Sequence, residues 1–169
     1  MKIKILLLTL ITIISGCGKS PEEPKQVTSS PPPAPSMLYE QLISSDNSVG
    51  DVFTVSALES GNAINYQSRA GVTNILESVV QYPDATGYVA IEKAYKFGEK
   101  YVLVVSTGEN GASCPATTYA FAFDTKTESI SGKKEIDGCS ENIESLSDGN
   151  KLIVKKDGAA STFYNGEIK

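Results

Sequence analysis

The sequence predicts an all-β protein whose folded body is a single antiparallel sandwich or barrel. Segment 52–57 alternates along the chain and places Phe53, Val55 and Ala57 on one face, as a half-buried strand does. Segment 101–106 is continuously apolar up to its final serine, which is typical of a central strand covered on both faces. Dipeptides that supply the positive φ angles of tight hairpins recur about every nine residues near the C-terminus. They are Asp137-Gly138, Asp148-Gly149, Asp157-Gly158 and Asn165-Gly166.

A third strand, at 117–123, divides its side chains by size. Its aromatic residues Tyr119, Phe121 and Phe123 fall on one face, and Ala120 and Ala122 fall on the other. This division indicates aromatics packed in a core and small residues that accept a neighbouring layer. Further strands are expected at 63–68, 88–95, 151–156 and 161–165, the first of them after a turn at 59–62.

Two segments are less regular. Apolar positions in 71–82 fit helical spacing, but five β-branched residues favour a strand, so we expect a bulged strand with a helix as the alternative. Segment 37–45 is expected to form one or two helical turns where the chain enters the domain.

The amino terminus has the pattern of an export signal. Lys2 and Lys4 precede a run from Ile5 to Ile14 that is apolar except for two threonines, and this run is about half the length that a membrane-spanning helix needs. The run ends at Ile14-Ser15-Gly16-Cys17, which resembles the lipobox of bacterial lipoproteins. The resemblance implies removal of residues 1–16 and acylation of Cys17, with a chance cysteine after an ordinary signal peptide as the alternative.

The mature chain is expected to have two parts. Residues 17–36 hold the acylated cysteine and a proline-rich linker that cannot bury enough apolar surface to fold, so we expect a disordered or polyproline-like tether. Residues 37–169 are expected to form one β domain. In lipoproteins of double-membraned bacteria, an aspartate after the cysteine favours retention at the inner membrane. Because Gly18 stands there, we expect the outer membrane, with the domain facing the periplasm.

The charge of the mature chain argues against nucleic acid as a partner. Removal of residues 1–16 takes two of the 15 basic residues and none of the 20 acidic ones, so the formal charge falls from −5 to −7. A chain with this charge and a single arginine, Arg69, lacks the basic face that phosphate binding needs. We therefore expect contact with a membrane through the lipid alone.

Two cysteines, Cys114 and Cys139, remain once Cys17 is acylated. Export places them in an oxidising compartment, so we expect them to form a disulfide. A metal site would need more ligands, and a catalytic thiol would need a base, whereas the sequence contains no histidine. We expect no cofactor.

The body also resembles an uncharacterised group of small secreted bacterial β proteins. The shared pattern is a strand ending in Val-Ser-Thr-Gly, a glycine-rich loop with Cys-Pro, an aromatic strand, and a later Gly-Cys-Ser, all between Tyr95 and Gly166. The resemblance implies the disulfide and the β fold, and it implies no activity.

The loop at 106–115 and several acidic residues are candidate reactive sites. Ser106 or Ser113 would be the nucleophile in a catalytic loop, but the loop lacks the lysine and the glycine spacing of known anion-binding and nucleophile motifs. We interpret it as a surface loop closed by the disulfide. The remaining candidates are acidic residues that lie among turn residues, so we expect solvated surface rather than acid–base or calcium sites. They are Asp46, Asp51, Glu141, Glu144 and Asp148.

These observations favour a non-catalytic protein-binding module over an enzyme. An acidic, tethered and crosslinked β domain suits an immunity protein against a secreted toxin, or an inhibitor of a wall-degrading hydrolase, because many such targets are basic. The expected contact surface is the loop Gly108–Ser113 with Glu109 and Glu141. The alternative is a structural or assembly lipoprotein of the cell envelope.

Overall fold

All described residues belong to one compact β unit. The computed structural model describes residues 37–45, 48–108, 116–136, 138–140 and 142–169. Within these ranges the chain forms three antiparallel sheets, and helical structure is limited to two short 3-10 turns, η1 (Ile75–Ser78) and η2 (Pro83–Ala85). The prediction of an all-β antiparallel fold is confirmed. In this part of the chain, neither helical turn has the length and apolar character needed to cross a bilayer.

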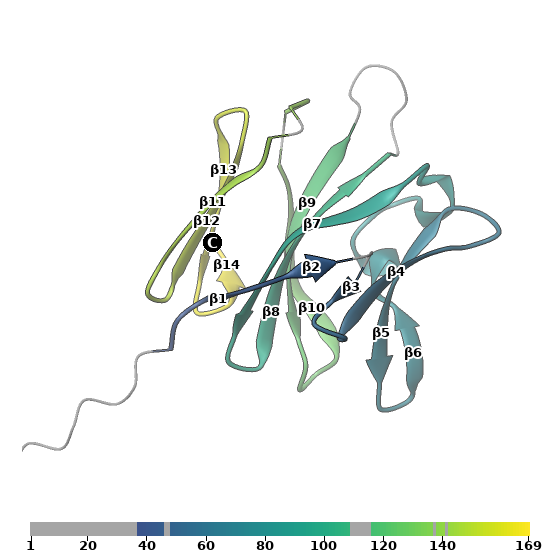
Figure 1. Ribbon diagram of the computed structural model, residues 1–169, viewed down its shortest axis with the longest axis horizontal. Helices are drawn as coiled ribbons and strands as arrows, with labels where there is room; N and C mark the ends of the chain where they lie inside the picture. The colour runs from purple at the N-terminus through teal and green to yellow at the C-terminus, as the bar shows by residue number, and fades with distance from the viewer. Residues whose placement is uncertain (1–36, 46–47, 109–115, 137, 141) are drawn as a thin grey trace, which may run out of the picture. The chain divides into compact units, whose positions relative to one another are not determined.

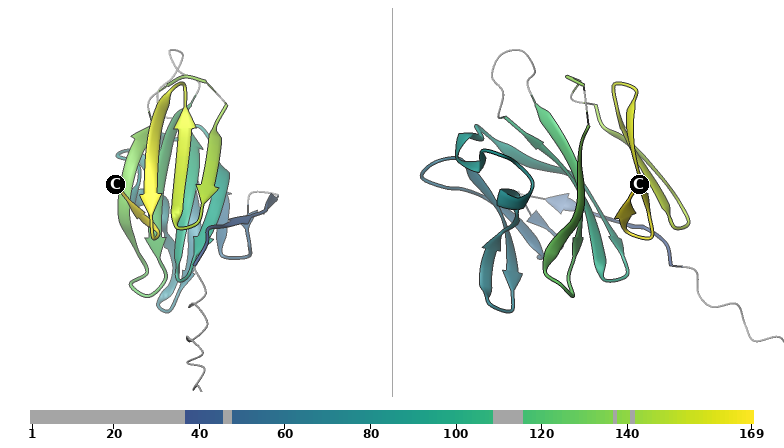
Figure 2. Two further views of the ribbon diagram at one scale, coloured as in Figure 1. Left: turned by 90° about the vertical axis from the view of Figure 1, so that its left-hand side faces the viewer. Right: turned by 180° about the vertical axis from the view of Figure 1, so that it is seen from behind.

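The three sheets stack as layers, with sheet A between sheets B and C (Figure 1). Sheet A has the order β1 (Glu40–Leu42), β7 (Val89–Phe97), β8 (Lys100–Thr107), β9 (Thr117–Asp124) and β10 (Ser129–Ile136). Sheet B has the order β2 (Ser44–Ser45), β3 (Ser48–Val49), β4 (Phe53–Ala57), β5 (Asn62–Ser68) and β6 (Gly71–Asn74). Sheet C has the order β11 (Glu144–Asp148), β12 (Lys151–Lys156), β13 (Ala159–Tyr164) and β14 (Glu167–Ile168); Figure 2 shows it face-on in the left view.

Sheet A is buried on both faces, and this gives the molecule two apolar layers rather than the one of a sandwich. Strand β8 is buried from Tyr101 to Thr107, as its continuous apolar run predicts. In β9 the aromatic face packs against sheet B, with Phe121 and Phe123 fully buried. The alanine face packs against sheet C, where Ala122 is fully buried among side chains of β12 and β13. The aromatic side chains of β9 therefore lie in the layer towards sheet B, and its alanines lie in the layer towards sheet C.

The predicted hairpin turns in sheet C are present. Both central residues of the β12–β13 turn have positive φ, 47° at Asp157 and 84° at Gly158, and the β13–β14 turn has 53° at Asn165 and 73° at Gly166. Two central residues with positive φ are the mark of a type I′ turn, whose twist matches that of the strands. At Asp148-Gly149 the aspartate still pairs with Lys151, so the loop begins at the glycine. Asp137 lies outside the described residues.

Segment 37–45 is not helical, so that prediction was wrong. Strand β1 pairs with β7 in the register Glu40↔Lys96 and Leu42↔Ala94, and β2 follows it in sheet B. Local helical tendency is worth a few tenths of a kcal/mol per residue, and the sheet edge supplies backbone hydrogen bonds along the segment. The chain thus crosses from sheet A to sheet B at this point.

Segment 71–82 combines both patterns that its sequence allowed. It begins as β6 and turns into η1, because the side chain of Asn74 ends the strand. The Asn74 Oδ1 atom accepts hydrogen bonds from the backbone N–H of Ile64 and of Leu76, each at 3.1 Å. This side-chain cap lets the chain leave the sheet. Four of the five helically spaced apolar residues, Ile75, Leu76, Val79 and Val80, are then buried, whereas Val72 in β6 is exposed.

Tyr39 anchors the start of the folded body between sheets A and C. Its side chain is buried, and its ring lies 4.8 Å from the ring of Phe97, measured between centroids. The backbone N–H of Gly166 donates a hydrogen bond of 2.8 Å to the Tyr39 hydroxyl. Burial raises the pKa of the Tyr39 hydroxyl above its ordinary value, although the hydrogen bond from Gly166 opposes this shift.

We expect the wild-type protein to lose folding stability as the pH rises above about 10, and we expect the Tyr39→Phe variant to lose less of it. Because the folded-state pKa of Tyr39 is raised, its contribution is fully present below about pH 10 and is lost as pH rises through the folded-state pKa. Below pH 10 the variant should be less stable by about 1 kcal/mol, since the N–H of Gly166 loses its acceptor. Urea unfolding between pH 8 and 11.5 tests this, and a difference that does not shrink above pH 10 would contradict it.

Candidate binding surface

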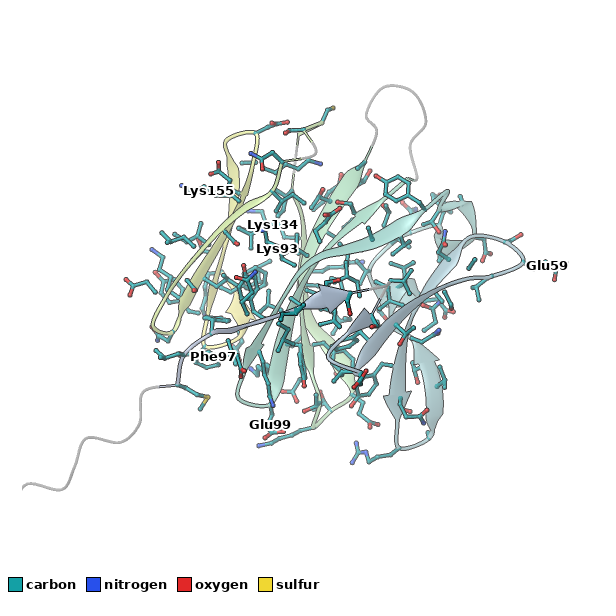
Figure 3. All side chains as sticks on the ribbon, viewed as in Figure 1. Glu59, Lys93, Phe97, Glu99, Lys134 and Lys155 are labelled. Carbon is teal, nitrogen blue, oxygen red and sulfur yellow. The ribbon has the colours of Figure 1, made fainter. Side chains whose placement is uncertain are left out.

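The described body has two opposite ends, defined by the strand register of sheet A. The chain enters the folded body at Met37, and we call this the proximal end. Met37 lies next to the β7–β8 turn, because a Cβ atom on Gly98 of that turn would lie 2.8 Å from the Met37 sulfur. The distal end contains Gly108 and Ala116, which follow β8 and precede β9. At about 3.4 Å per residue, β8 separates the two ends by roughly 24 Å. In Figure 3, Phe97 and Glu99 lie near the proximal end.

Six of the residues for which the sequence predicts a role lie outside the described residues. These are Cys17, Asp46, Glu109, Ser113, Cys114 and Glu141. Gly108, the first residue of the expected contact loop, is described and lies at the distal end, where its N–H donates to the carbonyl of Tyr88 at 3.1 Å. Cys139 is also described, and it is exposed.

The backbone around Cys139 is held against the β12–β13 turn. The N–H of Ser140 donates a 2.7 Å hydrogen bond to the carboxylate of Asp157. Gly138 packs so closely that a Cβ atom there would lie 2.7 Å from the same carboxylate. The neighbouring residue, Lys156, donates to the carbonyl of Ala116 at 3.2 Å. Adjacent residues of β12 and its turn therefore contact both the segment of Cys139 and the residue two positions after Cys114.

This arrangement is favourable for the predicted Cys114–Cys139 disulfide, which stays a prediction. We expect both thiols of the exported protein to resist alkylation in denaturant and to take up two labels once reductant is added, as read by intact mass. A Cys114→Ser variant is the control, because it should leave Cys139 reactive without reductant. Alkylation of both thiols in the unreduced wild-type protein would contradict the pairing.

The described members of the reactive-site candidates do not form a catalytic or metal centre. Ser106 is buried, and its hydroxyl lies 3.4 Å from the hydroxyl of Thr118. Asp51, Glu144 and Asp148 are exposed on turns and on an edge strand. Within the described ranges, no group of three or more histidine, cysteine or acidic side chains is placed to hold a metal ion.

Negative charge is concentrated on the layer of sheet B. Between residues 48 and 88 the described acidic residues are Asp51, Glu59, Glu77 and Asp84, and all four are exposed. Arg69 is the one basic residue in that range, and it forms an ion pair with Glu128 at 3.3 Å. The sequence predicts an acidic domain, but it does not show that one layer carries this excess.

A group of exposed apolar and acidic side chains lies at the distal corner of this layer. We call Leu58, Glu59, Tyr82, Asp84 and Tyr88 the tyrosine patch. These residues come from the β4–β5 turn, from η2 and its flanks, and from the position just before β7. The relative exposures of Leu58, Tyr82 and Tyr88 are 49%, 63% and 42%. These residues are not predicted by the sequence pattern, because isolated tyrosines in loops carry no periodic signal. The sequence feature that could have indicated this surface is the run of turn-forming residues between Tyr82 and Tyr88.

The patch is held in place by hydrogen bonds beneath it. Asn62 donates from its side-chain amide to the carbonyl of Thr86 at 2.9 Å, and the buried Thr86 hydroxyl donates to the carbonyl of Pro83 at 2.7 Å. Gly61 has a φ of +75°, and a Cβ atom there would lie 2.1 Å from the carbonyl oxygen of Pro83. Glycine therefore permits the direct contact between the β4–β5 turn and η2.

Comparison with known proteins gives no relative for this chain. No protein-family model, no curated protein and no solved structure matches it.

Proposed function

We propose that this chain is a lipoprotein anchored through Cys17 to the outer membrane, where its β domain faces the periplasm and acts as a non-catalytic protein-binding module. Its target would be a secreted toxin, for which the chain is an immunity protein, or a wall-degrading hydrolase, for which it is an inhibitor. The lipid would be its only contact with the membrane, and nucleic acid is not among its partners.

The observation that carries this proposal is that the chain enters at one end of sheet A, whereas the residues that flank the expected contact loop lie at the opposite end. Met37, the first described residue after the expected tether, lies at the proximal end, whereas Gly108 and Ala116 lie at the distal end. Tyr39 fixes the proximal end by packing on Phe97 and by its hydrogen bond with Gly166. A domain held by its proximal end at the end of a tether would present its distal end to soluble proteins, which supports a binding role.

Binding is tested with the processed, acylated chain purified in mild detergent. We expect it to retain one periplasmic protein or the product of a neighbouring gene, which is then identified, purified and titrated by calorimetry. The complex should be saturable, and the activity of a toxin or hydrolase partner should fall on binding. Turnover of a wall or lipid substrate by the chain alone, with no partner retained, would overturn the proposal. Retention of an envelope assembly component would favour the alternative, an assembly lipoprotein.

Anchoring is tested separately. We expect Cys17→Ala to abolish acylation and to leave the precursor uncleaved, because the cysteine thiol is the group that receives the lipid. Metabolic labelling with an alkyne fatty acid, followed by gel analysis, measures both effects. Cys139→Ala is the matched control and should be labelled as the wild type is. Equal labelling of Cys17→Ala and the wild type would contradict the anchor.

A further inference from the structure

We infer that the tyrosine patch is the docking site for a protein whose contact surface combines exposed lysine and arginine side chains with an apolar centre. This inference rests on the proposed function and adds to it the surface and the chemistry of the partner. It differs from the expectation drawn from the sequence, which places the contact in the loop Gly108–Ser113.

The side chains of the patch are the kind that stabilise protein interfaces. Tyr82 and Tyr88 are two of the three tyrosines among the exposed large side chains of the described residues, the third being Tyr164 in sheet C. Tyrosine is enriched among the few residues that contribute most of the binding free energy in protein complexes, because it buries a large area and retains a polar group. Leu58 adds an aliphatic side chain from the facing turn.

The patch is also pre-organised. The bonds from Asn62 to Thr86 and from Thr86 to Pro83 fix the segment that carries Tyr82. Just before β7, the N–H of Gly87 donates to the carbonyl of Gly108 at 3.3 Å, which ties the backbone beside Tyr88 to the residue that follows β8. A surface that is already ordered loses less conformational entropy on binding than a flexible loop does. Large exposed side chains on a fixed backbone therefore favour a binding role.

The charges around the patch define the partner. Glu59 and Asp84 are exposed within it, and neither forms an ion pair with any described residue. Figure 3 shows Glu59 at the tip of its turn, away from Phe97 and Glu99. Arg69, the basic residue of this layer, is paired with Glu128 near the β9–β10 turn and does not neutralise the patch. Complementary charge on the partner speeds encounter and selects against acidic proteins and nucleic acid.

Site-specific photocrosslinking in cells that produce the full chain tests the inference. The photoreactive residue p-benzoylphenylalanine replaces Tyr82 in one strain and, as the matched control, Tyr164 in another. Both positions are exposed, so the substitutions should leave thermal unfolding unchanged. We expect one protein adduct from position 82 and none from position 164, with an adduct partner that mass spectrometry identifies as a basic protein.

Charge reversal tests the chemistry of the partner. Glu59→Lys with Asp84→Lys should lower the adduct yield from position 82 about fivefold or more, and raised salt should lower it as well. The control is Glu144→Lys with Asp148→Lys in β11, which changes the net charge equally at exposed positions of sheet C and should leave the yield unchanged.

The outcomes separate this inference from the proposed function. If the detergent-purified chain retains a partner but position 82 gives no adduct, the tyrosine patch is not the docking site, and the proposed binding function is unaffected. The proposal of a basic partner would be contradicted if Glu59→Lys with Asp84→Lys left the adduct yield unchanged. It would also be contradicted if the control pair in β11 lowered the yield by the same factor. If the chain retains no partner and position 82 gives no adduct, both proposals fail.

Discussion

Phe121→Ala should destabilise the folded chain by about 3–5 kcal/mol, because it removes a fully buried aromatic ring from the layer between sheets A and B. Strand β9 is an interior strand of sheet A, so its neighbours β8 and β10 cannot both move to fill the cavity. Urea unfolding followed by circular dichroism measures the loss. Tyr164→Ala is the control, since this ring is partly exposed on sheet C and its removal should cost less than about 1 kcal/mol.

A substitution on the opposite face of β9 tests whether the two layers are distinct. Ala122→Leu adds bulk where sheet C approaches sheet A, and we expect a cost of about 1–3 kcal/mol from overpacking. Amide hydrogen exchange should become faster in β12 and β13 and should change little in β4 and β5. For Phe121→Ala we expect the reverse order of effects. Equal loosening of both layers in either variant would contradict the three-layer description.

Lys156→Ala should cost about 3 kcal/mol, because Lys156 is a buried lysine that joins sheets A and C. Its side chain is 1% exposed, and its Nζ atom donates to the Thr118 hydroxyl at 2.8 Å and to the carbonyl of Ala116. No described carboxylate lies within ion-pair distance of it; the two ion pairs found in the described ranges are elsewhere. Truncation removes the buried aliphatic stem and leaves two buried acceptors without this donor.

Lys156→Met separates packing from hydrogen bonding. Methionine keeps most of the buried stem and removes a charge that is costly to bury, so we expect a loss of about 1 kcal/mol, well below that of Lys156→Ala. Thermal and urea unfolding of both variants at pH 7 provide the comparison. A loss below about 1 kcal/mol for Lys156→Ala would show that the buried lysine does not stabilise the contact between the sheets.

Local sequence pattern was sufficient for the three inner strands of sheet A, β7, β8 and β9, and for the turns of sheet C. In β9, alternation of aromatic and alanine residues indicates two different neighbours, and both are present. At Asp157-Gly158 and Asn165-Gly166, the residues allow positive φ at low cost, and the hairpins form there. These features were predictable because strand alternation and turn conformation depend on a few neighbouring residues.

The sequence by itself thus determined the all-β class, the strand with two buried faces, the tight hairpins and the acidic charge. The tertiary structure decided the third layer, the strand at Glu40–Leu42, the turn after Asn74 and the tyrosine patch. Each of these depends on partners distant in sequence, such as Lys96 for Glu40, Ile64 for Asn74 and Asn62 for Thr86. A local pattern contains no information about which distant backbone group completes a hydrogen bond, and those bonds set where the chain turns and which side chains remain exposed.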